Sequence, residues 1–328
     1  GRRTILSNDL RDLLTETLAR GEQAIIMLNR RGYSTFVLCR ACGFVLSCHA
    51  CGQPMVYHAN GTLVCHHCDL RADVPAVCPK CGSRYIKYFG AGTEKLEAEL
   101  AQLLPQARVI RMDRDTTGRK HAHEEILAHF RRRDYDILLG TQMVAKGHDL
   151  PGVQTVGIIS ADASLNLPDF RAAERCFMLI TQTAGRAGRH GARGEVIVQT
   201  YNPEHYAVQS ALRQDYEAFY AQEIVLRREL FYPPLSRLVK LLFHHMDRQR
   251  AWDAAATFTD VFQKAFHGRQ GYMVVGPSPA LIARERGEYR FVVLIKAADL
   301  VDVQDFLRKQ RMHLRDDVAL DIDPITIF

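Results

Sequence analysis

The sequence lacks a long apolar run and a secretory leader. Its longest apolar stretches, such as 24–28 and 137–139, are far shorter than the roughly 18 residues that would cross a bilayer. The N-terminus has no apolar signal-peptide core, and no tract of low complexity interrupts the 328 residues. With 47% hydrophobic residues, the sequence predicts a soluble, cytoplasmic protein of two or three domains and argues against membrane, secreted and disordered proteins.

Two features that nucleotide hydrolases use are also missing. The sequence contains no Gly-x-x-x-x-Gly-Lys-Ser/Thr loop to cradle phosphates, and no Asp-Glu pair at a strand end to hold Mg²⁺. It begins at Gly1 without an initiator methionine. We therefore expect a fragment of a longer protein, and we expect no ATP hydrolysis by this chain alone.

Eight of the nine cysteines form four Cys-x-x-Cys pairs. Because nothing directs the chain to an oxidising compartment, disulfides are not expected. Each pair instead offers two soft thiolates on one tight turn, which is half of a tetrahedral zinc site, so four pairs predict two closed, structural Zn²⁺ sites. The predicted ligands are Cys39, Cys42, Cys48, Cys51, Cys65, Cys68, Cys78 and Cys81. The ninth cysteine, Cys176, lies in an apolar helical run and is expected in the core.

Spacing alone does not fix which pairs combine. We expect a nested arrangement, in which 39/42 joins 78/81 around 48/51 with 65/68, because a hairpin at Asn60-Gly61 would then close the inner site. An iron–sulfur cluster or redox-active thiols are the alternatives, and a neighbouring histidine could replace a ligand. Eight thiolates and two Zn²⁺ ions would lower the formal charge from +6 to about +2, so total charge is weak evidence for nucleic-acid binding.

Apolar and amphipathic segments alternate on both sides of the cysteine block at 37–83. Strands are expected at 24–28, 85–89, 109–112, 137–139, 153–160 and 195–200, and helices at 7–20, 94–104, 123–132 and 170–184. Strands separated by helices predict an α/β fold with a parallel sheet and helices on both faces. The cysteine block is then an inserted module.

A second pattern follows a helical stretch at 203–228 and the breaker Tyr232-Pro-Pro234. Strands are expected at 237–243, 272–275, 289–296 and 318–323, with helices at 249–266 and 299–312. This βαββαβ order predicts a separate, small α+β domain.

Two segments place glycines and polar residues where parallel strands end, the edge at which such sheets bind ligands. Residues 137–151 read ILLGTQMVAKGHDLP, and residues 182–189 read QTAGRAGR. The second segment sets Arg186 and Arg189 three residues apart at a helix end. Taken alone, such a loop could merely neutralise a helix C-terminus or a carboxylate.

These two segments and the four cysteine pairs together resemble the family of primosomal replication restart DNA helicases, the primosomal N′ proteins, over essentially the whole chain. MDRDTT at 112–117, Asp162 and FRAAE at 170–174 add to the match. The resemblance implies a second RecA-like helicase lobe at 1–36 and 84–202, with a zinc-binding insertion at 37–83. A helical linker at 203–234 and a C-terminal DNA-binding domain at 235–328 would follow.

The resemblance also implies roles for individual residues. Segment 137–151 resembles helicase motif V, so Thr141 would contact the DNA backbone, and Gly147 and Asp149 would face the nucleotide. Segment 182–189 resembles motif VI, in which Arg186 and Arg189 would be arginine fingers that stabilise charge on a γ-phosphate, together with Gln182.

Further DNA contacts are expected at three places. Arg30 and Arg31 follow a strand, whereas Gly92 and Thr93 open a helix whose free N–H groups suit a phosphate, although Thr93 as an ordinary helix cap is the alternative. In the C-terminal domain, four residues could hold a branched backbone and stack a base: Arg284, Arg286, Tyr289 and Arg290. A solvated hairpin arm is the alternative there.

The function implied is part of an ATP-dependent 3′ to 5′ DNA helicase that recognises stalled or branched replication forks and starts primosome assembly. ATP and Mg²⁺ would bind only together with the missing first lobe. Implied partners are branched and single-stranded DNA, single-stranded DNA-binding protein, primosome proteins and the loader of the replicative helicase. A non-enzymatic zinc-stabilised docking adaptor is the alternative, against which the two arginines argue. An RNA helicase is disfavoured by the eight-cysteine insertion.

Overall fold

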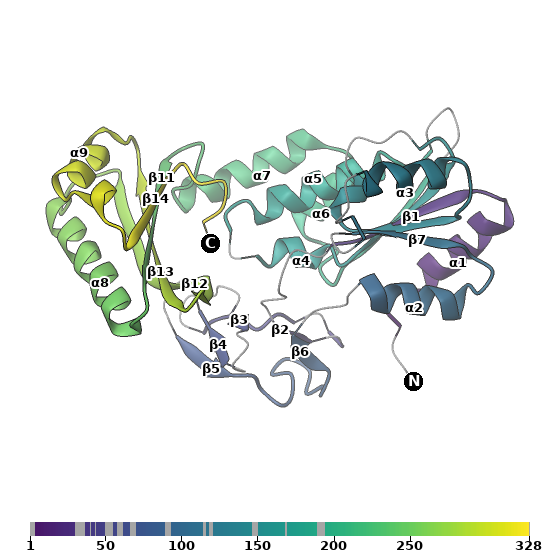
Figure 1. The fold of residues 1–328 in the computed structure, drawn as a ribbon, viewed down its shortest axis with the longest axis horizontal. Helices are drawn as coiled ribbons and strands as arrows, with labels where there is room; N and C mark the ends of the chain where they lie inside the picture. Colours follow the sequence, from purple (N-terminus) through teal and green to yellow (C-terminus); the bar gives the residue numbers. More distant parts are fainter. Residues whose placement is uncertain are drawn as a thin grey trace. The chain divides into compact units, whose positions relative to one another are not determined.

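The computed structural model describes most of the chain. The described residues are 4–29, 37–39, 41–42, 44–49, 55–57, 62–65, 70–88, 93–113, 116–117, 121–145, 150–167, 169–188 and 194–327. The chain forms two compact units (Figure 1). The first unit comprises Gly1–Ser34, Phe89–Asn166 and Ala173–Phe219, and the second comprises Thr35–Tyr88, Leu167–Ala172 and Tyr220–Phe328. The finer domain boundaries expected from the sequence stay predictions.

A five-stranded sheet organises the first unit, with the order β10-β9-β1-β8-β7. Its strands are β1 (Gln23–Leu28), β7 (Val109–Met112), β8 (Ile137–Gly140), β9 (Val153–Ile159) and β10 (Glu195–Gln199). Every pairing in the sheet is parallel, with β1 between β8 and β9. The predicted α/β fold with a parallel sheet is confirmed.

Helices cover both faces of this sheet. The helices of the first unit are α1 (Asn8–Ala19), α2 (Thr93–Leu103), α3 (Ala122–Arg131), α4 (Asp162–Leu165), α5 (Ala172–Ala184) and α6 (Tyr206–Leu212), and α7 (Tyr216–Glu229) runs on into the second unit. Alternate residues of β1 point to opposite faces: Ile25 packs in the cluster with α3 and α5, and Ile26 packs in the cluster with α1 and α2 (Figure 1). All six β1 residues are therefore buried, which explains the unbroken apolar run at 24–28.

Two small antiparallel sheets hold the cysteine block. One pairs β2 (Val37–Cys39) with β6 (Ile86–Tyr88), and the other has the order β3-β4-β5, with β3 (Val56–Tyr57), β4 (Thr62–Val64) and β5 (Arg71–Asp73). Val56 pairs with Val64, as a hairpin around residues 60–61 requires, and that turn itself lies outside the described residues. The strand expected at 85–89 was wrongly placed in the parallel sheet. It pairs with β2, forty-odd residues earlier in the chain, and a short apolar run does not reveal its partner.

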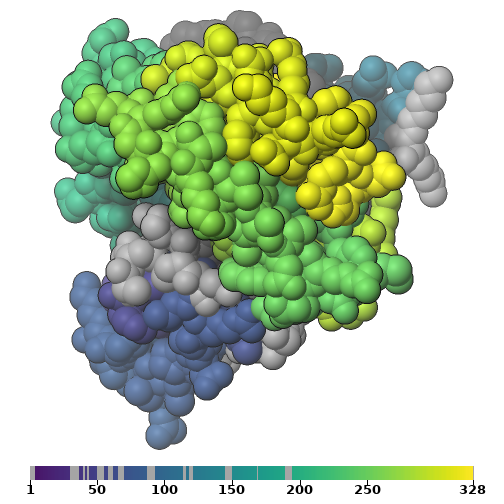
Figure 2. Space-filling view, turned by 90° about the vertical axis from the view of Figure 1, so that its left-hand side faces the viewer, coloured from purple at the N-terminus to yellow at the C-terminus, as the bar shows by residue number. Residues whose placement is uncertain are grey.

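The C-terminal part of the second unit is a four-stranded antiparallel sheet covered by helices. The elements are β11 (Arg237–His245), α8 (Arg248–Ala265), β12 (Tyr272–Glu285), β13 (Glu288–Ala297), α9 (Val301–Lys309) and β14 (Val318–Ile322). The sheet order is β12-β13-β11-β14, so the predicted βαββαβ arrangement is confirmed. Phe258 and Phe262 of α8 pack with Phe306 of α9 in its core. Figure 2 shows this part of the chain as the green to yellow surface.

Strand β12 is much longer than the 272–275 expected from the sequence. The expected strand stops before Gly276-Pro-Ser-Pro279, but pairing with β13 resumes at Ser278 opposite Val292. A register shift between Val275 and Ser278 accommodates the prolines, which cannot donate ladder hydrogen bonds. Within the described part of the chain, no helix has the length and hydropathy needed to cross a bilayer.

Candidate metal centre and motor-lobe site

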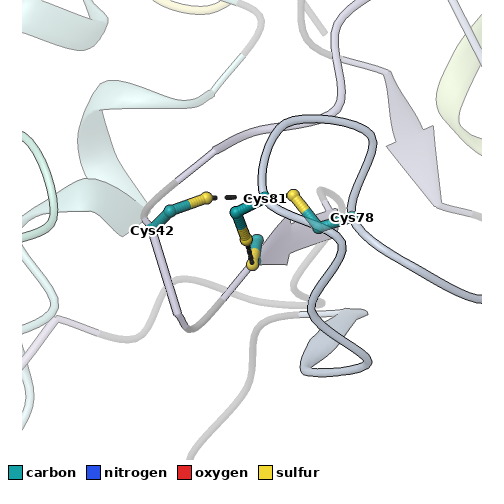
Figure 3. Close-up of side chains that lie close together, drawn as sticks. Cys42, Cys78 and Cys81 are labelled. Atoms are coloured by element: carbon teal, nitrogen blue, oxygen red, sulfur yellow. Dashed lines mark hydrogen bonds between the residues drawn. The ribbon is translucent and has the colours of Figure 1, made fainter.

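Four cysteine thiols converge on one point in the second unit. The sulfur atoms of Cys39, Cys42, Cys78 and Cys81 all lie within 4.8 Å of one another. Cys39 Sγ is 3.7 Å from Cys81 Sγ, and Cys42 Sγ is 3.8 Å from Cys78 Sγ (Figure 3). A tetrahedral Zn²⁺ ion with Zn–S bonds of about 2.3 Å separates its ligands by about 3.8 Å. The donor set and its spacing therefore fit a closed, four-thiolate zinc site.

Local backbone structure presets this geometry. The Cys39 N–H donates to Phe44 O at 2.8 Å, and the Cys78 N–H donates to Ser83 O at 2.8 Å, so each pair sits in its own tight turn. Gly82 completes the second turn with a φ of 69°, which glycine adopts at little cost. The β2–β6 pairing lies next to the cluster, because Cys39 is the last residue of β2.

The thiols do not ionise equally. Burial raises the pKa of Cys39, but backbone N–H groups of Ala41 and Cys42 and neighbouring thiols outweigh it and lower the value to about 6. The Ser83 N–H lowers the pKa of Cys81, but hydrogen bonds with the other thiols outweigh it and raise the value to about 12. Four thiolates this close repel one another, so full ionisation calls for a cation.

The structure brings together the outer pairs of the nested arrangement. Of the inner pairs, Cys48 and Cys65 are both buried and belong to the same apolar cluster as Cys39 and Cys78. Cys51 and Cys68 lie outside the described residues. The inner zinc site therefore stays a prediction.

Polar side chains link three loops at the carboxyl edge of the parallel sheet. Asn29 follows β1, Gln142 follows β8, and Ser164 lies in α4 after β9. Asn29 Nδ2 donates to Ser164 Oγ at 2.8 Å, and Gln142 Nε2 donates to Asn29 Oδ1 at 3.5 Å. Thr141 of the predicted motif V begins the same loop as Gln142 and is half-buried. Gly147 and Asp149 lie outside the described residues, as do Arg30 and Arg31.

A buried carboxylate fixes the end of β9 against β10. Asp162 is 2% exposed and accepts from Thr200 Oγ1 at 2.9 Å and from the Tyr201 N–H at 3.0 Å. Burial raises the pKa of this carboxyl group, against the opposing effect of its hydrogen bonds. The residue that matched the family between the two motifs thus holds two neighbouring strand ends together.

Helix α5 leads directly into the predicted motif VI. Gln182 is exposed on its last turn, and half-buried Arg186 follows the helix, with its N–H donating to Thr183 O at 3.0 Å. The backbone then passes very close to Gly194, where a Cβ would lie 2.3 Å from Gly188 N. Arg189 lies outside the described residues. Sequence reasoning did not single out Gly194, whose signal is only that it follows motif VI and precedes a strand.

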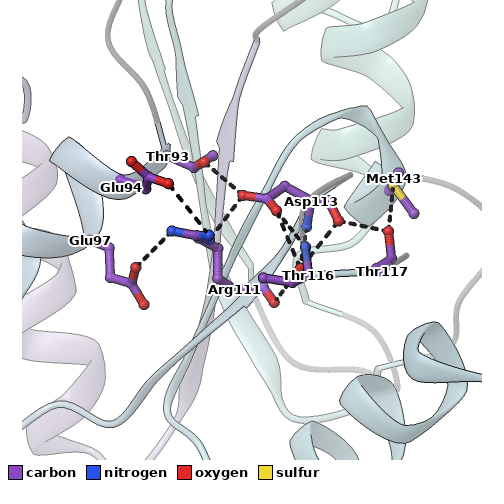
Figure 4. A network of polar contacts seen from close by, with 8 residues as sticks. All are labelled: Thr93, Glu94, Glu97, Arg111, Asp113, Thr116, Thr117 and Met143. Atoms are coloured by element: carbon purple, nitrogen blue, oxygen red, sulfur yellow. Dashed lines mark hydrogen bonds and ion pairs between the residues drawn. The ribbon is translucent and has the colours of Figure 1, made fainter. Parts of the chain in front are cut away.

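Thr93 belongs to a buried network around Asp113 (Figure 4). Its hydroxyl donates to Asp113 Oδ2 at 2.7 Å, and that carboxylate also lies 2.9 Å from Arg111 Nε and accepts from the Thr116 N–H at 3.1 Å. Thr93 is 1% exposed and Asp113 is 3% exposed. The Thr93 side chain is therefore not offered to a ligand, and Gly92 lies outside the described residues. Asp113 was predicted only as part of the MDRDTT match at 112–117, although an acid directly after a strand was a signal.

The predicted DNA-binding residues of the C-terminal domain surround one hairpin tip. Arg286 and Gly287 join β12 to β13 with φ values of 51° and 89°, which is the pattern of a type I′ turn. Arg284 and Arg286 are exposed, and Arg284 Cζ lies 4.9 Å from the Tyr289 ring centroid. Arg290 is paired with Glu285. The two exposed arginines can face a phosphate backbone, whereas base stacking on Tyr289 requires Arg284 to move.

Two family models match the chain. Residues 83–191 match the helicase conserved C-terminal domain, and residues 228–325 match the C-terminal domain of primosomal protein N. The C-terminal domain of the DEAD-box protein Dbp5 covers 68% of this chain at 14% identity with a TM-score of 0.33. A TM-score this low does not establish a shared fold, so the fold class rests on the strand order and the family models. Together they define the class of protein: a helicase C-terminal lobe combined with a primosomal C-terminal domain.

Similar proteins of known name narrow the class to one family of helicases. The replication restart protein PriA of Bacillus subtilis (strain 168) is 46% identical over 319 residues, which are 97% of this chain and 39% of that protein. The PriA of Synechocystis sp. is 40% identical over 338 residues, and that of Treponema pallidum is 39% identical over 328 residues. They cover 100% and 98% of this chain, and the chain spans 40% and 50% of their lengths. The chain belongs to the replication restart protein PriA family and spans half or less of these relatives.

Proposed function

We propose that this chain is the nucleotide-closing and DNA-contacting part of an ATP-dependent 3′ to 5′ DNA helicase that acts at stalled or branched replication forks. One observation carries the proposal: the chain combines a parallel motor sheet, whose helix α5 ends two residues before Arg186, with a four-thiolate cluster in a sequence up to 46% identical to PriA proteins. An adaptor that never hydrolyses ATP would need no cation at that helix end.

In this proposal the chain completes an ATP site that a first motor lobe begins. Arg186 and Arg189 face the γ-phosphate, Gln182 lies beside them, and Gly147 and Asp149 face the nucleotide from motif V. A guanidinium group stabilises charge that develops on the transferring phosphoryl group. The Asn29–Ser164 and Gln142–Asn29 hydrogen bonds support this assignment, because they hold the loops after β1, β8 and β9 in one register.

DNA contacts are proposed on both units. In the first unit they are Thr141, which follows β8, together with Arg30 and Arg31, which come directly after Asn29 in the sequence. Gly92 and Thr93 contribute backbone N–H groups at the start of α2, since the Thr93 hydroxyl is already bound to Asp113. In the second unit, Arg284, Arg286, Tyr289 and Arg290 bind the backbone of a branched substrate, with Arg284 and Arg286 making the first contacts.

The cysteine module is proposed to hold two structural Zn²⁺ ions. The outer ion is bound by Cys39, Cys42, Cys78 and Cys81, whose spacing fits a tetrahedral site. The inner ion is bound by Cys48, Cys51, Cys65 and Cys68. Closed sites leave no position for a substrate water, so the ions stabilise a surface and do not catalyse. Reduced thiols are consistent with a protein that acts in the cytoplasm, where the proposed partners are single-stranded DNA-binding protein, primosome proteins and the helicase loader.

The test compares this chain with a longer protein that adds the first motor lobe, called here the two-lobe protein. We expect DNA-stimulated ATP hydrolysis by the two-lobe protein and none by the chain alone. Arg186→Ala should lower the DNA-stimulated kcat by about 1,000-fold, the scale of an arginine finger, with little change in fork-DNA affinity. The matched control is Arg213→Ala, which removes an exposed arginine beyond α6. Fork binding without any hydrolysis by the two-lobe protein would support the adaptor instead.

A further inference from the structure

A short segment between two parts of the first unit belongs to the second unit. The chain leaves the first unit after Asn166, contributes Leu167–Ala172 to the second unit, and returns at Ala173. We call residues 167–172 the strap. Its last residue, Ala172, is the first residue of α5, the helix that ends two residues before Arg186.

The strap anchors its phenylalanine in an aromatic and cationic socket. The Phe170 ring stacks on Tyr232, with 5.1 Å between centroids and 8° between the planes. Two guanidinium groups also lie over the Phe170 ring, Arg171 at 5.1 Å and Arg227 at 5.2 Å. Lys296 Nζ lies 3.5 Å from the centroid of the Tyr232 ring. Stacked rings with cations over their faces attract one another electrostatically as well as by burial.

The socket is fixed by contacts that do not involve the strap. Arg227 Nε forms an ion pair with Glu223 Oε1 at 2.7 Å, and both side chains are largely buried. Arg227 Nη1 donates to Pro233 O at 3.1 Å, and Lys296 Nζ donates to Leu230 O at 2.7 Å. Because its walls are held by the second unit, the socket receives Phe170 as a preformed site.

Short-range hydrogen bonds join the described residues of the strap, which exclude Pro168. The Asp169 N–H donates to Leu167 O at 2.8 Å, and Asp169 is 8% exposed. Its carboxylate accepts from the Arg171 N–H at 2.9 Å, and its carbonyl accepts from the Ala172 N–H at 2.9 Å. Arg171 Nη1 reaches Ile325 O at 3.5 Å. Only Arg171 lies between Phe170 and Ala172, the first residue of the 13-residue helix α5, so a shift of the Phe170 ring is passed along α5.

We propose that Phe170 is a positioning residue: its stack on Tyr232 ties helix α5, and with it Arg186, to the second unit, so that the second unit's engagement with DNA controls ATP hydrolysis. This rests on the proposed function. The strap then gives a role to the phenylalanine that opens the FRAAE segment at 170–174.

The kinetic test uses the two-lobe protein and separates coupling from folding. Phe170→Leu keeps an apolar side chain but removes the ring, and Phe170→Tyr keeps the ring. We expect Phe170→Leu to lower the DNA-stimulated kcat at least about tenfold, because small misplacements far from the chemistry carry effects of up to about 100-fold. KM for ATP, fork-DNA affinity and hydrolysis without DNA should stay within about twofold. Phe170→Tyr should restore the wild-type kcat, and Tyr85→Leu, an exposed aromatic of the same unit, is the matched control.

A second arm needs no ATP hydrolysis. Hydrogen exchange of the amides of 173–188 is measured on the 328-residue chain. Phe170→Leu and Tyr232→Leu should each raise the exchange rate, and the double variant should raise it no further, because both single variants break the same stack. Phe170→Tyr should leave the exchange rate unchanged. The positioning role of Phe170 is refuted if exchange is unchanged in both single variants, or if Phe170→Leu leaves the DNA-stimulated kcat unchanged. A wild-type two-lobe protein without DNA-stimulated hydrolysis overturns the proposed function instead, and the exchange arm still decides whether the strap holds α5.

Discussion

Replacing Cys78 by serine should remove one zinc ion from the chain. Cys78 is 1% exposed, and its sulfur lies 3.8 Å from Cys42 Sγ, which is the edge expected for a tetrahedral four-thiolate site. A serine oxygen sits on a shorter bond and does not ionise near neutral pH, so the fourth ligand is lost. We expect zinc affinity at this site to fall by at least about 100-fold, since partners outside the ligand set already contribute 10- to 100-fold.

Elemental analysis of the purified chain measures this directly. The proposed content of two zinc ions per chain should fall to one in Cys78→Ser, and amides of β2 and β6 should exchange faster, because those strands lie next to the site. Cys176→Ala is the matched control, since Cys176 is buried in α5 and belongs to no pair. An unchanged zinc content in Cys78→Ser, or a lost zinc in Cys176→Ala, would refute the assignment.

Three further predictions concern stability, each read from urea unfolding. Asp113→Ala should lower the unfolding free energy by about 3 kcal/mol, because the buried Thr93 and the half-buried Arg111 lose a charged partner. Asp134→Ala, at an exposed position, should change this free energy little, and equal effects of the two variants would contradict the network. Gly194→Ala should cost about 1–3 kcal/mol, because the added Cβ would lie 2.3 Å from a backbone nitrogen, and a stability equal to wild type would contradict that close approach. Burial lowers the pKa of Lys296 from 10.5 to about 8, so the folded state binds fewer protons than the unfolded state between these values. Stability should therefore rise with pH from about 8 to 10.5, by up to roughly 3 kcal/mol, and Lys296→Met should remove that rise; a slope that persists in the variant would contradict the assignment.

Much of the fold could be predicted from short-range patterns. The buried run at 24–28 and the alternation of strands with helices predicted the parallel sheet, because a strand covered on both faces has no polar positions. The βαββαβ order of residues 237–322 was also predicted, because the alternation of apolar and polar residues marks each of its strands and helices. Regular Cys-x-x-Cys spacing predicted zinc ligands, because thiolates on tight turns have few other uses in a reduced chain.

Long-range pairings could not be predicted. Nothing in the apolar run at 86–88 indicates that it pairs with 37–39 and not with the motor sheet. The strand expected at 272–275 stops before the prolines at 277 and 279, yet a register shift lets β12 continue past them. The sequence did not reveal that the Thr93 hydroxyl is bound to the buried Asp113, which leaves only backbone N–H groups for a phosphate at this helix start. Phe170 stood in a recognised stretch, but only the structure shows its stack on Tyr232.

Strand separation is the most direct test of the central claim. A forked duplex with a labelled strand is incubated with ATP and the two-lobe protein, with Arg186→Lys as the variant that keeps the charge but loses the planar guanidinium. Our account predicts ATP-dependent unwinding with 3′ to 5′ polarity and its loss in Arg186→Lys, while both proteins bind the fork equally. Unwinding that does not depend on ATP, or that proceeds unchanged in the variant, would contradict the assignment of this chain to the motor.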